Sequence, residues 1–189
     1  MSGDFAAART NMVESQVRTQ DVTDLAIQDA MRAVPREALV PASKKAIAYA
    51  DVEVEYAPGR ALLKPRDVAK LLQAVRPRRG EKALAIAAPY AAAVMEAMGL
   101  SVERLDGDDL KTVSGTYDVI VCEGAVAKAP PSWCEALAPG GRLGVVERSG
   151  PQGCAVVYVK AEGVVGSRSL FDTSPPFLAG FEPATGFVF

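Results

Sequence analysis

Hydrophobic positions in the N-terminal part of the chain recur with helical spacing. One predicted helix follows Thr23, a favourable N-cap residue, and ends before Pro35. Its apolar face consists of Leu25, Ile27, Ala30, Met31 and Val34. A second helix is predicted over residues 41–48, and a third from Pro65, a residue suited to the first helical turn, to Val75. We expect residues 50–60 to be extended or looped.

From Lys82 the pattern changes to short apolar runs separated by helical segments, which is typical of a parallel sheet with crossover helices. The predicted strands are KALAIA (82–87), SVERLD (101–106), YDVIVCEGA (117–125) and RLGVVER (142–148). Helices are predicted over 89–99 and near 132–137, and the turn Pro139-Gly140-Gly141 follows the second of them. The pattern therefore predicts an α/β fold.

The last part of the chain predicts an antiparallel addition to this sheet. CAVVYVK (154–160) and VGSRSLF (165–171) are expected to form an antiparallel pair. The closing GFVF (186–189) has three apolar residues in four, so we expect it to return to the sheet edge.

Composition limits the organisation and the partners. A chain of 189 residues that is 49% hydrophobic predicts one domain over 1–189, with a helical portion (1–80) and a sheet portion (81–189). The formal net charge of -2 gives no general attraction for nucleic acid or for an anionic membrane. We therefore expect neither as a partner, and a protein partner would have to be recognised locally.

Targeting signals and cysteine pairs are also missing. No apolar run approaches the roughly 18 residues of a membrane span, and the start lacks the order of a signal peptide, so we expect a cytoplasmic protein. Cys122, Cys134 and Cys154 are widely separated and odd in number. This spacing predicts reduced thiols, with neither a disulfide framework nor a bound metal.

The sequence contains no histidine, which removes several catalytic classes at once. A Ser/His/Asp triad, a Cys/His pair and HExxH zinc chemistry all require that residue. Carboxylate, lysine and positioning chemistry remain. Methyl transfer is of the last kind, because it mainly requires that two reactants be aligned.

Several stretches in order resemble one enzyme family. They are MVESQVRTQDVTD (12–24), VPREALVP (34–41), AYADVEVEY (48–56), YDVIVCEGA, LAPGGRLGVVE (137–147) and the closing LFD, GF and FVF. Together they resemble the protein-L-isoaspartate O-methyltransferase family over most of the chain. The resemblance implies a Rossmann-like class I methyltransferase fold with a doubly wound sheet and an N-terminal helical extension. It also implies an enzyme that uses S-adenosylmethionine to methylate isoaspartyl carboxylates.

The glycine-rich cofactor turn of that family is altered in this chain. The family's first strand carries an acidic residue and leads into GxGxGY, where the backbone approaches the cofactor. Here Ala85 replaces the acidic residue, Ala87 replaces the first glycine, and the turn is about two residues short before the matching Tyr90. Each added Cβ takes space from the cofactor, and Pro89 removes one N–H. We therefore expect no bound cofactor.

The second cofactor-binding strand end is ambiguous. Only SVERLD lies between KALAIA and YDVIVCEGA, so the sheet is expected to be shortened by about one β/α unit. Asp106 is then either the ribose ligand that ends the family's second strand or part of an adenine-side turn after the third. Glu123 falls at another ligand-bearing strand end, where it could equally cap a helix or a loop. The lost helix would expose an apolar sheet face, available to a homodimer or another protein.

The substrate side also departs from the family. Catalytic members read GxGQTIS-P, whereas this chain reads PGRALLKP (58–65), so both hydroxyl groups are gone. Arg60 and Lys64 could still attract a peptide carboxylate, although surface cations before a helix are commonly only solvated.

Three hypotheses follow. The chain is a pseudo-methyltransferase that acts through protein contacts, with Ala85, Ala87, Tyr90, Asp106 and Glu123 as vestigial cofactor positions and no catalytic residue. Alternatively, it is an active S-adenosylmethionine-dependent protein-L-isoaspartate (D-aspartate) O-methyltransferase with a remodelled site that uses Asp106. A third alternative is a module that binds isoaspartyl or acidic peptides through Arg60 and Lys64 without modifying them.

Overall fold

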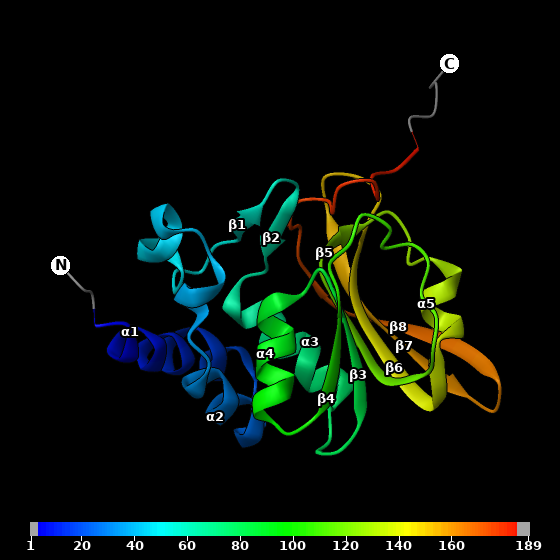
Figure 1. Ribbon diagram of the computed structural model, residues 1–189, viewed down its shortest axis with the longest axis horizontal. Coiled ribbons are helices and arrows are strands. Elements are labelled where there is room, and N and C mark those ends of the chain that lie inside the picture. Colours follow the sequence, from blue (N-terminus) through cyan, green and yellow to red (C-terminus); the bar gives the residue numbers. More distant parts are fainter. Residues whose placement is uncertain (1–3, 185–189) are drawn as a thin grey trace.

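A layer of N-terminal helices packs against one face of a mixed β-sheet (Figure 1). The computed structural model describes residues 4–184. The predicted return of GFVF (186–189) to the sheet edge concerns residues outside this range and stays a prediction. In the described part of the chain, no helix has the length and apolar character needed to cross a membrane.

The N-terminal helices begin at aspartate caps. Helix α1 (Phe5–Met12) continues into a π-helical turn (Val13–Val17) and a 3₁₀ turn (Arg18–Gln20). Helix α2 (Leu25–Ala33) is capped by Asp24, whose carboxylate accepts the backbone N–H groups of Ala26 and Ile27. The sequence predicted Thr23 as this cap, which is wrong by one residue. The backbone N–H of Thr23 donates instead to Gln73 (2.8 Å).

The connection from α2 to the sheet is less helical than predicted. The segment predicted as a helix over 41–48 is a 3₁₀ helix (Ala42–Ile47), and another 3₁₀ turn (Arg36–Leu39) precedes it. The predicted extended region holds the antiparallel hairpin of β1 (Val54–Ala57) and β2 (Arg60–Leu62). Helix α3 (Pro65–Val75) has the predicted bounds, with Pro65 in its first turn.

The large sheet has six strands in the order β4-β3-β5-β6-β7-β8. They are β3 (Lys82–Ile86), β4 (Ser101–Leu105), β5 (Tyr117–Val126), β6 (Leu137–Arg148), β7 (Gly153–Ala161) and β8 (Val164–Asp172). Strands β4, β3, β5 and β6 run parallel to one another. Strand β7 runs antiparallel to β6, and β8 runs antiparallel to β7, so these last two form the predicted antiparallel pair. Helix α4 (Pro89–Ala97) connects β3 to β4, and the short α5 (Pro131–Glu135) connects β5 to β6.

The strand order fits a doubly wound sheet, and it agrees with the predicted shortening if the Rossmann order is taken as the reference. A doubly wound sheet has the order 3-2-1-4-5-6, in which the second strand pairs with the first and the third lies outside it. Here β4 pairs directly with β3 and is the last strand at that edge. In the Rossmann order β4 would occupy the second position, and the third strand would belong to the missing unit.

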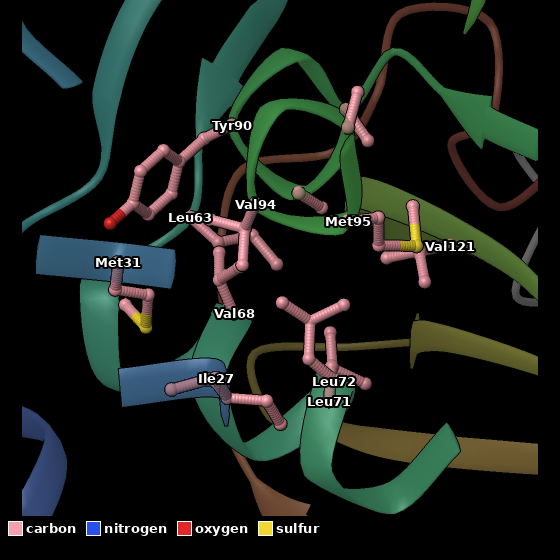
Figure 2. Packing of buried hydrophobic residues seen from close by; sticks show 14 of the residues in the cluster. Ile27, Met31, Leu63, Val68, Leu71, Leu72, Tyr90, Val94, Met95 and Val121 are labelled. Atoms are coloured by element: carbon pink, nitrogen blue, oxygen red, sulfur yellow. The ribbon is translucent and has the colours of Figure 1, made fainter. Parts of the chain in front are cut away.

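One buried cluster joins the helical portion to the sheet. Figure 2 shows Ile27 and Met31 of α2, Leu72 of α3 and Val94 of α4, which all belong to this cluster. The same cluster reaches Val121 on β5. Because full burial of one such side chain contributes about 1.5–3 kcal/mol, this shared core holds the N-terminal helices on the sheet.

The opposite face of the sheet is covered despite the missing unit. Leu84 and Ile86 on β3 are buried, in a cluster that includes Leu110 from the loop after β4 and Trp133 from α5. The indole Nε1 of Trp133 donates to the carbonyl of Leu110 (2.8 Å). The expectation of an apolar face left bare beside the missing unit is therefore not met on β3, because this loop covers it.

Candidate functional site

The turn between β3 and α4 is closed around alanine side chains. Ala85, Ala87 and Ala88 are buried, and Ala87 has φ of +46°, a left-handed conformation that is strained for a residue with a Cβ. The N–H of Ala87 donates to the carbonyl of Leu105 (2.9 Å), and its carbonyl accepts the hydroxyl of Tyr56 (3.1 Å). The backbone groups of Ala87 are thus bonded within the protein.

The N-terminus of α4 is occupied by a carboxylate of the chain itself. Glu123 Oε1 accepts the N–H of Ala91 (2.7 Å), and its Oε2 accepts the N–H of Leu63 (3.0 Å). Free N–H groups and the helix dipole make the start of a crossover helix attractive to an anion. In this chain the Glu123 side chain takes that position, so the sequence prediction of a cap describes its role.

Glu123 is part of a buried polar cluster with Arg36 and Tyr90. All three are 0% exposed. Burial raises the pKa of Glu123, while Arg36 and the bonded N–H groups oppose that rise. Arg36 donates to the carbonyls of Ala48 (2.7 Å) and Leu63 (2.6 Å), and its guanidinium lies 4.6 Å from the centre of the Tyr90 ring. Burial lowers the pKa of Arg36. The cluster ties the N-terminal portion to the start of α4.

Tyr90 therefore faces the protein interior. Burial raises the pKa of its phenol. Within residues 4–184, neither the Tyr90 hydroxyl nor Arg36 Nη1 has a hydrogen-bond partner. The sequence singled out Tyr90 as a cofactor position and did not identify Arg36, whose only signal was its place in the VPREALVP stretch.

Asp106 lies at the end of β4 beside Arg60. The guanidinium of Arg60 donates to the carbonyls of Asp106 (2.5 Å) and Gly107 (2.6 Å) and lies 4.0 Å from the Asp106 carboxylate. The Arg60 side chain is 19% exposed, whereas that of Asp106 is 46% exposed. The structure thus brings together two predicted site residues, Arg60 and Asp106. β4 pairs directly with β3, so Asp106 follows the strand next to β3, which is the position expected of the family's second strand.

The two cations predicted to line a substrate groove both have partners in the protein. Arg60 is held by the end of β4 as described. Lys64 Nζ lies 3.8 Å from the carboxylate of Glu53. The structure does not bring Lys64 together with the other predicted site residues.

A C-terminal segment, Thr173–Glu182, lies across this edge of the sheet and was not anticipated. Figure 1 shows it passing the upper end of β5 beside the β1–β2 hairpin. The N–H of Leu178 donates to the carbonyl of Ala125 (2.8 Å), and that of Ala179 donates to the carbonyl of Gly59 (3.3 Å). A Cβ on Gly59 would lie 2.7 Å from the Cβ of Ala179. Glycine at this position is the one sequence signal that could have indicated so close an approach.

Cys122 and Cys134 are not activated nucleophiles in the described structure. Cys122 is buried, and burial raises the pKa of its thiol. Burial also raises the pKa of Cys134. In residues 4–184, no three His, Cys, Asp or Glu side chains are grouped so that they could hold a metal ion.

Comparisons with known proteins agree on one family. The family model described as Protein-L-isoaspartate(D-aspartate) O-methyltransferase (PCMT) matches residues 7–105. A protein-L-isoaspartate O-methyltransferase of Methylorubrum populi is 33% identical over 185 residues, which cover 83% of this chain and 87% of the relative. Another, of Methylorubrum extorquens, is 43% identical over 105 residues, which cover 54% of this chain and 46% of that protein. The latter match thus spans less than half of the relative.

A solved structure supports the same fold. A beta-aspartate methyltransferase (PCMT) from Plasmodium falciparum, in complex with S-adenosyl-L-homocysteine, superposes with a TM-score of 0.74. The two are 16% identical, and the superposition covers 90% of this chain and 97% of that one. At this identity the similarity concerns the fold alone.

Proposed function

The chain belongs to the protein-L-isoaspartate(D-aspartate) O-methyltransferase family, and we propose that it is a non-catalytic member that acts through protein contacts. The relatives are named as methyltransferases, and one similar structure holds S-adenosyl-L-homocysteine, the product that S-adenosylmethionine leaves after methyl transfer. The proposal therefore depends on whether the residues of this chain fit that group.

The observation that carries the proposal is the bond between Glu123 and the start of α4. The cofactor's methionine carboxylate would have to replace a carboxylate that already accepts the N–H groups of Ala91 and Leu63. Losing two hydrogen bonds to a charged group costs about 3–6 kcal/mol. That cost weakens binding roughly a hundredfold to ten-thousandfold. A site with a dissociation constant of about 1 μM would then have one of roughly 0.1–10 mM, and the closed turn weakens binding further.

The closed turn between β3 and α4 also weakens cofactor binding. Ala87 is fully buried, so its Cβ stands where the glycine-rich turn of the family leaves room for the cofactor. Arg60 covers the carbonyls at the end of β4, where the ribose would be bound. The residues of this chain therefore do not fit S-adenosylmethionine in the family's manner.

Calorimetry with S-adenosylmethionine and with S-adenosyl-L-homocysteine tests the proposal. The Methylorubrum populi relative, measured in parallel, is the positive control. We expect no heat of binding to the chain at ligand concentrations up to about 1 mM, a range in which ligands bind with only about 4 kcal/mol. Micromolar binding of either compound would overturn the proposal.

A second candidate is an active methyltransferase with a remodelled site. Asp106 favours it, because its carboxylate is half exposed at the second strand end, where the ribose hydroxyls would lie. Transfer of a labelled methyl group to an isoaspartyl peptide would support this candidate, provided that Asp106→Asn abolishes it. The hypothesis that Arg60 and Lys64 capture acidic peptides gains no support, because both side chains are held by the protein.

A further inference from the structure

One face of the β7–β8 hairpin lacks a covering helix. Helix α3 packs on the same face of the sheet over β5, β6 and β7 but leaves the outer part of the hairpin uncovered. Val157, Val159, Ala161, Val164 and Gly166 line a hollow of about 430 Å³ there. Val164 is 70% exposed and Val159 is 39% exposed. An antiparallel hairpin can leave one face to water, but that face normally carries polar side chains, whereas this one is apolar.

Two further hollows extend this surface toward the end of α3. One of about 330 Å³ lies beside Arg76, Arg78 and Val157. The other, of about 720 Å³, lies beside Lys70, Arg76 and Phe171. Arg168 on β8 lines all three hollows, so they adjoin. We call them together the β8 groove.

The β8 groove has an excess of positive charge. Arg76, Arg78 and Arg168 are exposed, and no carboxylate in residues 4–184 lies within 4.0 Å of them. Arg142 also lines the groove, but Glu81 neutralises it through two hydrogen bonds of 3.0 Å. These three arginines are therefore available for a ligand.

The acidic residues of the groove lie at one end only. Asp24 caps α2 with its carboxylate, and Asp21 lies beside it in the same hollow. The rest of the groove combines exposed arginines with an apolar floor, and this combination matches a ligand with both carboxylates and apolar side chains.

We propose that the β8 groove binds an acidic segment of a partner protein. Apolar side chains of the segment lie against Val159 and Val164, and its carboxylates pair with Arg76, Arg78 and Arg168. The inference rests on the proposed function in one respect, namely that protein contacts are what the chain does. The β8 groove itself lies away from the closed turn after β3.

Two other occupants fit the groove less well. A single-stranded nucleic acid binds through stacking on free aromatic rings, but the aromatic ring in the groove, Phe171, has Lys70 Nζ 4.5 Å from its centre. A second copy of the chain would form a two-fold interface, which sets each patch against itself. That arrangement brings the arginines of both copies together, with a repulsion that a separate acidic partner avoids.

Fluorescence anisotropy with the full chain and a labelled peptide tests the proposal. The probe is a peptide of about 15 residues with glutamate and leucine at helical spacing. We expect it to bind more tightly than a peptide with glutamine for glutamate or one with serine for leucine. The affinity should fall as salt is raised, because exposed charge pairs are screened.

Variants of the exposed residues locate the binding surface. Arg78→Glu and Arg168→Glu should each weaken binding about tenfold, the effect of roughly 1.4 kcal/mol. Val164→Ser should weaken it several-fold, since it removes exposed apolar surface. Arg79→Glu is the matched control, because Arg79 is exposed in the same loop but lines none of the three hollows. We expect it to weaken binding much less than Arg78→Glu does.

Several results would overturn the proposal. One is equal loss of affinity in Arg79→Glu and Arg78→Glu, which would indicate a general charge effect. Another is tighter binding of a single-stranded RNA than of the peptide, and a third is self-association that Val164→Ser abolishes. None of these measurements involves S-adenosylmethionine, so failure here is distinguishable from failure of the proposed function.

Discussion

Replacing Gly59 by alanine tests whether the C-terminal segment is fixed over the end of the sheet. Gly59 has φ of +67°, and its missing Cβ would lie 2.7 Å from the Cβ of Ala179, a distance that forces a displacement. Left-handed backbone costs a residue with a Cβ about 1–2 kcal/mol. The overlap adds roughly 1–3 kcal/mol, as for other overpacked sites. We therefore expect Gly59→Ala to lower the free energy of unfolding by about 2–5 kcal/mol.

Gly163 provides the matched control. Its φ of +80° is similar, but no atom lies within 4 Å of the position of its Cβ. Gly163→Ala should therefore cost only the backbone part, about 1–2 kcal/mol. In urea, with an m-value of about 2 kcal/mol/M, the midpoint should fall by roughly 1–2.5 M for Gly59→Ala and by about 0.5–1 M for the control.

Hydrogen exchange identifies the cause of the difference in stability between Gly59→Ala and Gly163→Ala. The N–H of Leu178 donates to Ala125, and that of Ala179 donates to Gly59. Both N–H groups should exchange with solvent faster in Gly59→Ala and at an unchanged rate in Gly163→Ala. Equal loss of stability in the two variants, with unchanged exchange at Leu178, would refute the close approach of Ala179 to the β1–β2 turn.

Two further predictions concern buried polar groups. Arg36→Met should lower the free energy of unfolding by about 2–6 kcal/mol in urea, because it leaves the buried carbonyls of Ala48 and Leu63 without their donor and removes the charge that favours the ionised form of Glu123; a loss below about 1 kcal/mol would mean that neither group needs Arg36. Burial and the bond to Glu103 raise the pKa of Tyr117 from 10.0 to about 12. The neutral phenol is therefore favoured in the folded state, so its contribution to stability is complete below pH 10 and is lost as the pH rises to about 12. Tyr117→Phe should remove that part of the pH dependence, and an absorbance titration that shows Tyr117 ionising near pH 10 would contradict the assignment.

The sequence predicted the elements of the sheet because their patterns are local. Alternation and apolar runs located β3 to β8, and Pro65 located the start of α3. The predicted cap of α2 was off by one residue, since Thr23 and Asp24 are both good caps and only the structure shows which one reaches the free N–H groups.

Contacts between distant residues could not be predicted in this way. Glu123 bonds to N–H groups of Leu63 and Ala91, and Arg60 reaches the end of β4. Neither pairing leaves a pattern in one sequence, because each depends on how β2, α4 and β5 meet in space. The path of the C-terminal segment is hidden for the same reason, apart from the glycine that it contacts.

The carboxylate of Glu123 at the start of α4 also changes how the protein responds to its surroundings. A methyltransferase that binds its cofactor gains stability as the cofactor concentration rises above the dissociation constant. This chain carries its anion covalently, so the same helix end is neutralised at every concentration of that metabolite. Under the proposed function, its melting temperature should be the same with and without a methyl donor, so its stability would not follow the methyl metabolism of the cell.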